Sequence, residues 1–280
     1  MAALLLLLSS LLLALHAAAA ASAAAAATLA PSAAAATLAP ALRASRNPKR
    51  GFVADGCKGA SCVDFELLAS AGWYYGYNPE DPYAGSNAPN PRFTPMHWCI
   101  STDPIPPGTN ATYLLGYNEP NNAHNCNKSP AVIAAAWKEV MQLWGATSIL
   151  VSPATAGDGR QWYTEFFGNC SALYGARGCQ IAHLATHDYS CDATKTLAYL
   201  KELHDLFSLP VWLTEMSCGD GADAKPMADH LAYMRAVFPM LDSAYFVYRY
   251  AWMSARSANR GLVDTNGTTL TPVGELFVSL

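Results

Sequence analysis

The chain has 280 residues, of which 14% are charged and 52% are hydrophobic, and its formal net charge is -4 at pH 7. Proteins that bind nucleic acid carry a basic surface, so this composition argues against nucleic acid as a partner. None of the eight cysteines forms a C-x-x-C pair of the kind that binds zinc, and an even count behind an export signal favours disulfides.

An apolar block from Leu4 to Leu15 opens the chain, and an alanine-rich tract follows it. The block is too short to cross a bilayer and has the length of a signal-peptide core. We predict a signal peptide over residues 1–27, an alanine-rich linker over 28–49 and a catalytic domain over 50–280, secreted or located in the cell wall. No Lys or Arg precedes the block, and the alanine-rich tract offers several possible cleavage points rather than one. A membrane anchor, formed by the block and the alanines if the leader is not cleaved, is the alternative.

The domain, about 230 residues long, has the size of a single large α/β fold. Several N-x-S/T motifs in a chain with an export signal indicate glycosylated surface loops. These motifs begin at Asn110, Asn127, Asn169 and Asn266. We therefore expect a secreted glycoprotein, and we expect it to be a monomer.

The first half of the domain contains short apolar runs with strand or helix spacing. Strands are predicted at 51–55, 72–78 and 93–98, and a helix at 63–71. Pro95 weakens the hydrogen bonding expected of the third strand.

A fourth apolar run begins at Leu114 and stops at Asn118, Glu119 and Pro120. Proline disfavours helical geometry in the residue before it, so Glu119 is expected to be extended at the last position of a strand. A carboxylate there is more typical of chemistry than of packing, although a polar turn after a strand is the alternative.

The second half of the domain alternates strands and helices. The first of its helices, at 129–144, has Ser129 as N-cap and Pro130 at its first position. Further helices are predicted at 160–174, 194–207, 228–241 and 272–278, and strands at 148–153, 181–187, 210–215 and 244–252. Eight strand-like runs, most of them apolar on both faces, predict a (β/α)8 TIM barrel.

In a TIM barrel the active site lies at the carboxyl ends of the strands. Glu119 ends the fourth strand and Glu215 ends the seventh, and these two positions face each other across the mouth of the barrel. In glycoside hydrolysis one carboxyl group protonates the leaving oxygen while the other attacks the anomeric carbon or activates water. A separation of about 5 Å would predict retention of configuration. A structural carboxylate is the alternative for Glu215.

The cysteines fit the same strand order. Two pairs follow neighbouring strands and so lie on neighbouring loops, and two more pairs are close enough in sequence to close short local loops. Eight cysteines allow 105 pairings, and the predicted order of the strands guides the choice of this set. The predicted disulfides are Cys99–Cys126, Cys191–Cys218, Cys57–Cys62 and Cys170–Cys179.

Other polar and aromatic residues occupy the predicted strand ends. Asn118 can bond a sugar 2-hydroxyl or hold Glu119, and Tyr189 can donate to Glu215 and keep it ionised. Two tryptophans offer flat faces to sugar rings, with core packing as the alternative. The candidate substrate-binding residues are Asn118, His187, Tyr189, Trp252, Trp98, Tyr77 and Asp188.

Five motifs occur in order along the domain: Phe93-Thr94-Pro95-Met96-His97-Trp98, Gly116-Tyr117-Asn118-Glu119-Pro120-Asn121, Leu150-Val151-Ser152-Pro153-Ala154, Trp212-Leu213-Thr214-Glu215 and Tyr250-Ala251-Trp252. As a set they resemble glycoside hydrolase family 128, a β-1,3-glucanase family of the clan A barrels, from about Gly51 to Leu280. The resemblance implies that Glu119 is the acid/base, Glu215 the nucleophile and the reaction a retaining endo-hydrolysis of β-1,3-glucan, with no metal or organic cofactor.

Two positions depart from the pattern expected of that family. His187-Asp188-Tyr189 stands where we expect His-Trp-Tyr, and the second-strand end Tyr75-Gly76-Tyr77-Asn78 also differs. Loss of an aromatic platform would shift sugar preference or subsite length, and Asp188 would raise a neighbouring carboxyl pKa by repulsion. The alternatives are a clan A glycosidase for β-1,4-glucan or mannan, and a non-catalytic glucan-binding wall protein. A binding protein would not need both acids.

Overall fold

The computed structural model describes residues 46–59, 61–84, 92–101, 111–221 and 224–280. The predicted signal peptide, the linker up to residue 45 and the sequon at Asn110 lie outside the described residues.

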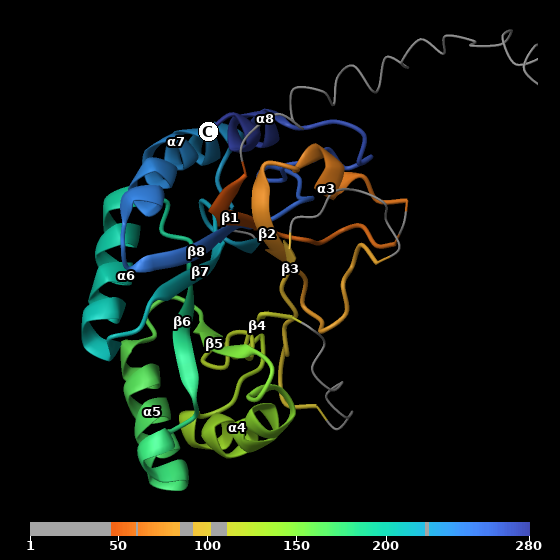
Figure 1. Cartoon of the computed structure of the whole chain (residues 1–280). Coiled ribbons are helices and arrows are strands. Elements are labelled where there is room, and N and C mark those ends of the chain that lie inside the picture. Colours follow the sequence, from red (N-terminus) through yellow and green to blue (C-terminus); the bar gives the residue numbers. More distant parts are fainter. Residues whose placement is uncertain (1–45, 60, 85–91, 102–110, 222–223) are drawn as a thin grey trace, which may run out of the picture. The chain divides into compact units, whose positions relative to one another are not determined.

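One parallel sheet runs through the domain (Figure 1). Its neighbouring strands follow the order β3-β2-β1-β8-β7-β6-β5-β4. A separate parallel bridge joins Met96 and Leu115, in the segments that follow β3 and β4. The strands are β1 (Asn47–Val53), β2 (Ala71–Tyr75), β3 (Arg92–Phe93), β4 (Tyr113–Leu114), β5 (Ile149–Thr155), β6 (Ile181–Asp188), β7 (Val211–Met216) and β8 (Val247–Trp252).

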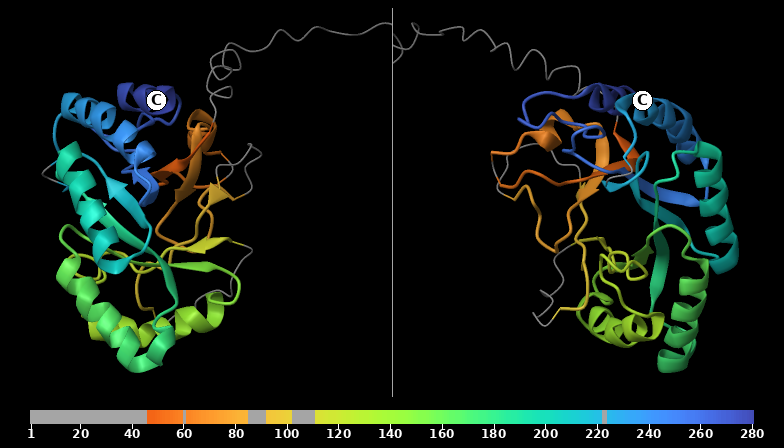
Figure 2. Two further views of the ribbon diagram at one scale, coloured as in Figure 1. Left: turned by 60° about the vertical axis from the view of Figure 1, so that its left-hand side comes forward. Right: turned by 180° about the vertical axis from the view of Figure 1, so that it is seen from behind.

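The sheet is curled (Figure 2). Buried residues from its strands form an inner hydrophobic core. Strands from every part of the sheet contribute to this core, among them β2 with Trp73, β5 with Val151 and β7 with Trp212. The two indoles meet edge to face with their centroids 5.0 Å apart. Gly51 on β1 allows this packing, because a Cβ atom there would lie 2.5 Å from the Trp73 ring. The aromatic filling supports a curl that brings distant strand ends together.

Helices lie along the outer face of the curled sheet (Figures 1 and 2). Ser129 caps the first long helix by accepting from the N–H of Val132, and Pro130 is at its first position, as predicted. In the described part of the chain, no helix combines the length and apolarity that a membrane span needs. The helices are α3 (Asp64–Leu67), α4 (Pro130–Trp144), α5 (Arg160–Tyr174), α6 (Ala193–Phe207), α7 (Met227–Ser243) and α8 (Pro272–Ser279), with a 3-10 turn η2 (Gly175–Arg177).

The prediction of an α/β fold with a parallel sheet is confirmed, and the five long helices lie close to their predicted ranges. The N-terminal third differs. Strand β1 already begins at Asn47, which pairs with Ala71 of β2, so the predicted helix at 63–71 ends early, at Leu67. The predicted strand at 93–98 is short because Pro95 has no N–H to donate to the ladder.

All four predicted disulfides are formed, and they account for every cysteine of the chain. Two of them join loops beside the predicted catalytic residues, since Cys126 follows Glu119 and Cys218 follows Glu215. The pairs are Cys57–Cys62, Cys99–Cys126, Cys170–Cys179 and Cys191–Cys218. Of the described sequon residues, Asn127 and Asn266 are exposed and Asn169 is half-buried on α5.

Candidate active site

Glu119 lies where the chain turns after β4. Its φ is +44°, in the left-handed region, so the predicted extended conformation is wrong. The Glu119 N–H donates to the carbonyl of Ala154 at 2.8 Å, and its own carbonyl accepts from the N–H of Asn122 at 3.0 Å. The following proline disfavours right-handed helical geometry, but it does not choose between extended and left-handed backbone. The contacts of the turn make that choice, and they place the carboxylate among the strand ends.

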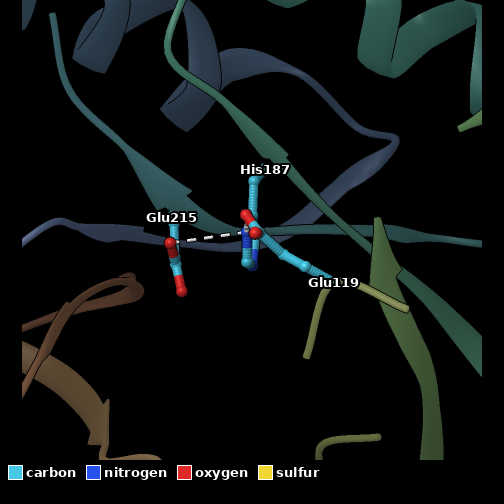
Figure 3. Close-up of side chains that lie close together, drawn as sticks. All are labelled: Glu119, His187 and Glu215. Carbon is cyan, nitrogen blue, oxygen red and sulfur yellow. Dashed lines mark hydrogen bonds and ion pairs between the residues drawn. The ribbon is translucent and has the colours of Figure 1, made fainter. Parts of the chain in front are cut away.

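Glu119 and Glu215 meet on either side of His187 (Figure 3). The Nδ1 atom of His187 lies 2.8 Å from Glu119 Oε1 and 3.4 Å from Glu215 Oε2. All three residues are buried, and one ligand atom from each lies within 4.8 Å of the other two. Retaining glycosidases separate their two carboxyl groups by about 5–5.5 Å. The geometry therefore suits a pair that acts on one glycosidic bond.

The same three side chains are close enough to hold a metal ion. A histidine that binds metal usually donates through its other ring nitrogen to a carboxylate or carbonyl. Here the buried Nε2 of His187 has no hydrogen-bond partner among the described residues. The arrangement therefore suits a proton held at Nδ1 between two carboxylates better than an ion.

Tyrosine hydroxyls surround the Glu215 carboxylate. Tyr77 donates to Oε1 at 2.8 Å, Tyr75 donates to the same oxygen at 3.3 Å, and Tyr189 donates to Oε2. Burial and the charge of Glu215 raise the pKa of all three tyrosines, which therefore remain donors. Sequence reasoning placed Tyr77 and Tyr189 correctly beside this site but missed Tyr75. The alternation of side chains along a strand could have identified Tyr75, because it lies two residues before Tyr77 and so shares its face.

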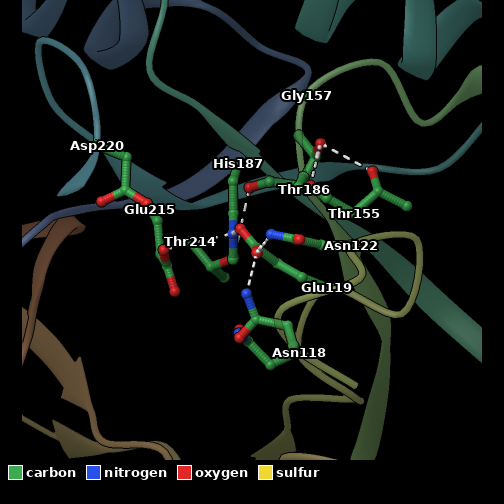
Figure 4. Close-up of polar contacts among 12 residues, drawn as sticks. Asn118, Glu119, Asn122, Thr155, Gly157, Thr186, His187, Thr214, Glu215 and Asp220 are labelled. Carbon is green, nitrogen blue, oxygen red and sulfur yellow. Dashed lines mark hydrogen bonds and ion pairs between the residues drawn. The ribbon is translucent and has the colours of Figure 1, made fainter. Parts of the chain in front are cut away.

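Two asparagines that sequence reasoning missed bind the other oxygen of Glu119. Figure 4 shows one of them, Asn122, beside the carboxylate. Asn122 Nδ2 donates to Oε2 at 2.6 Å, and Asn125 Nδ2 donates to it at 2.5 Å. The Oδ1 atom of Asn125 in turn accepts from Asn118 Nδ2 at 3.3 Å. A cluster of amides shortly after a strand-end glutamate was the signal in the sequence.

The charges of the site shift two pKa values in opposite directions. Burial acts to raise the pKa of Glu119, but the hydrogen bond and charge of His187, with the bond from Asn122, outweigh it and lower the pKa from 4.5. Burial acts to lower the pKa of His187, but the charges of Glu215 and Glu119 and the hydrogen bond to Glu119 raise it from 6.5. His187 is therefore a cation between two carboxylates across the mildly acidic range.

These shifts predict how the Glu119–His187 pair contributes to stability. The contribution of Glu119 is present above pH 4.5 and is lost as the pH falls through its lowered pKa. That of His187 is present below pH 6.5 and is lost as the pH rises through its raised pKa. Urea unfolding of wild type and His187→Gln should therefore differ most between these two values, on the order of 1.5–3 kcal/mol. A difference independent of pH would contradict the ion pair.

Trp98 is the most exposed of the predicted site residues, with 40% of its surface accessible. Its carbonyl accepts from the N–H of Asn118 at 2.7 Å, so the ring extends from a backbone fixed beside the acid. This position leaves Trp98 a candidate platform for a sugar ring.

Trp252 and Asp188 lie away from the carboxylates, which corrects two expectations. Trp252 is fully buried against Phe238 of α7, and its indole N–H donates to the carbonyl of Arg260 at 2.8 Å. Asp188 turns outward and accepts from the hydroxyls of Ser190 and Thr196. The expected repulsion by Asp188 is not found at Glu119, whose pKa is lowered.

Two buried carboxyl groups at the carboxyl edge of a curled parallel sheet suit the active site of a glycoside hydrolase. A model described as the glycosyl hydrolase catalytic core matches residues 51–277, so the chain belongs to that family. The resemblance to glycoside hydrolase family 128 is also confirmed by solved structures. A subgroup II endo-β-1,3-glucanase of that family from Pseudomonas viridiflava is 26% identical, with a TM-score of 0.70 over 84% of this chain and 99% of its own.

Two further relatives complete the comparison. A subgroup I endo-β-1,3-glucanase from Amycolatopsis mediterranei, solved with laminaritriose, is 24% identical and shares the fold, with a TM-score of 0.69 over 83% of this chain and 99% of its own. Alkali-sensitive linkage protein 1 of Schizosaccharomyces pombe is 29% identical over an alignment of 184 residues that covers 61% of this chain. The match spans 33% of the length of that relative.

Proposed function

We propose that this chain is a secreted, retaining endo-β-1,3-glucanase that acts on cell-wall or storage β-glucan. The observation that carries the proposal is the contact of two buried glutamates, Glu119 and Glu215, with one histidine at the strand ends. The endo-β-1,3-glucanases of similar fold support the choice of substrate. The four disulfides support an extracellular location.

In this mechanism a carboxylate oxygen of Glu215 attacks the anomeric carbon while Glu119 gives its proton to the glycosidic oxygen. The carbon–oxygen bond breaks, its electron pair stays with the leaving sugar, and a glycosyl ester of Glu215 forms. Glu119 then takes a proton from water as that water attacks the anomeric carbon and frees Glu215. Two displacements at one carbon leave its configuration unchanged.

We also propose that the sheet closes as a complete (β/α)8 barrel. The Met96–Leu115 bridge supports closure, because it lies between the two edge strands of the ladder, β3 and β4. Closure would hold Trp98 beside the acid, since the Trp98 carbonyl accepts from the N–H of Asn118 at 2.7 Å.

The purified secreted protein should release oligosaccharides from laminarin and curdlan but not from carboxymethylcellulose or mannan. Proton NMR of the first product formed should show the β-anomer before mutarotation. A range of oligosaccharide lengths from the earliest times indicates endo action. Release from carboxymethylcellulose or mannan alone would mean that the substrate is β-1,4-glucan or mannan and not β-1,3-glucan. Tight glucan binding without release would mean that the protein is a non-catalytic binder.

A further inference from the structure

The loop from Pro120 to Asn127 folds back over the Glu119 carboxylate. The Cys99–Cys126 disulfide ties its far end to the segment after β3. Asn121 ties its near end to the next loop, since its Nδ2 donates to the carbonyl of Ala156 at 2.8 Å and its Oδ1 accepts from the Ala156 N–H at 2.9 Å. Both attachments fix the loop independently of its contacts with the acid.

Within this loop, Asn125 bonds both residues of the strand end. Its Nδ2 donates to Glu119 Oε2 at 2.5 Å, and its Oδ1 accepts from Asn118 Nδ2 at 3.3 Å. Asn122 also donates to Glu119 Oε2, but its own Oδ1 accepts from the backbone N–H of His124 at 3.0 Å. One amide, that of Asn125, therefore connects Asn118 with the acid.

The free site favours the wrong protonation state for an acid. Glu119 accepts hydrogen bonds from His187, Asn122 and Asn125, and such donors stabilise a carboxylate. A general acid must carry a proton when the glycosidic bond breaks. The titratable groups that face Glu119 are His187 from β6, Glu215 from β7 and Tyr77 after β2. At least one donor must therefore withdraw when substrate binds.

Asn118 can link sugar binding to the loss of a donor from Glu119, because it is bonded to Asn125. It is 3% exposed, and among the described residues its buried Oδ1 has no hydrogen-bond partner. A sugar hydroxyl has both a proton to give to this oxygen and lone pairs to accept from Nδ2. Binding through both atoms would compete directly with the bond from Asn118 to Asn125.

We propose that Asn125 is a positioning residue that couples sugar binding at Asn118 to the release of Glu119 for proton donation. This inference deepens the proposed function and rests on it. A sugar hydroxyl displaces Asn125 from Asn118, and Asn125 then turns away from Glu119. The proton on His187 Nδ1, 2.8 Å from Oε1, passes to Glu119 and from there to the leaving oxygen. In the second displacement the proton taken from water returns by the same route.

The test compares the pH dependence of the free and the bound enzyme. For laminarihexaose, kcat/KM reports the free enzyme, and the single-turnover rate at saturating enzyme concentration reports the complex. Each of these rates should fall at high pH as the acid loses its proton, and this fall is the basic limb of its pH profile. In wild type the basic limb of the single-turnover rate should lie about one pH unit above that of kcat/KM. In Asn125→Ala the two limbs should coincide, and in Asn122→Ala they should stay apart. A 2,4-dinitrophenyl laminaribioside, which needs no acid, should lack the basic limb with every variant.

Asn118→Ala is a second way to break the coupling if Asn125→Ala does not fold, and it too should merge the limbs. His124→Ala, in the same loop with an exposed side chain, is the matched control and should behave as wild type. Coinciding limbs in wild type, or separated limbs in Asn125→Ala, would overturn the role of Asn125. If wild type releases nothing from laminarin or laminarihexaose, the proposed function itself fails.

Discussion

Glu215→Gln should lower laminarin hydrolysis by at least about 10⁴-fold, because the neutral amide is a poor nucleophile and cannot form the glycosyl ester. Glutamine has nearly the shape of glutamate; one of the hydroxyls of Tyr77 and Tyr189 can still donate to its side-chain oxygen, and the other can accept from its amide nitrogen. Binding of laminari-oligosaccharides should therefore persist while turnover is lost. Initial rates and isothermal titration calorimetry of the two proteins measure these separately.

The role of each glutamate can be assigned by rescue with azide and a dinitrophenyl glycoside. In Glu215→Ala, azide occupies the space of the lost carboxylate, attacks the anomeric carbon and gives the α-glycosyl azide. In Glu119→Ala, Glu215 still forms the ester, azide then attacks it, and the product is the β-glycosyl azide. The opposite products would exchange the two roles. Hydrolysis by Glu215→Gln at the wild-type rate would remove Glu215 from the reaction.

The elements that sequence predicted best are those specified by neighbouring residues. Helix α4 begins where Ser129 caps it and Pro130 fits its first turn. Strand β3 was predicted too long because Pro95 cannot donate to the ladder, and the backbone bonds there involve residues distant in sequence: the N–H of Leu115 donates to the carbonyl of Pro95 at 2.9 Å. Local patterns therefore suffice for the helices from α4 onward, whereas the end of α3 and the segments at Pro95 and Leu115 are decided by tertiary contacts.

The same distinction applies within the site. Glu119 and Glu215 could be predicted because each ends an apolar run, but the loop that returns Asn125 to Glu119 could not. For Trp252 the missing information was which face of β8 points inward. The structure puts small Ala251 in the inner core, where Trp73 and Trp212 fill the space, so Trp252 faces α7. The sequence of a single strand does not show how much of the inner core is already filled by side chains from other strands.

Arg256→Met should destabilise the fold by about 3 kcal/mol, because it leaves the buried carboxylate of Asp64 without its cation. Asp64 at the start of α3 is fully buried, and the Arg256 guanidinium after β8 binds it through Nη2 at 2.7 Å and through Nε at 3.1 and 3.0 Å. Removing the cation leaves a buried negative charge whose remaining side-chain hydrogen bond, among the described residues, is the weak one from Tyr83 at 3.4 Å. Breaking one side of a buried ion pair typically costs about 3–5 kcal/mol.

The comparison that tests this reasoning is between two arginines with similar bonding and different exposure. Arg160 contacts Asp158 at 2.6 Å and Glu202 at 2.7 Å, but its side chain is 41% exposed, against 15% for Arg256. Water screens the exposed group, so Arg160→Met should leave urea unfolding nearly unchanged. Adding Asp64→Asn to Arg256→Met removes the unpaired charge and should recover at least half of the loss. If the double variant is no more stable than Arg256→Met alone, lost packing rather than the buried charge explains the destabilisation.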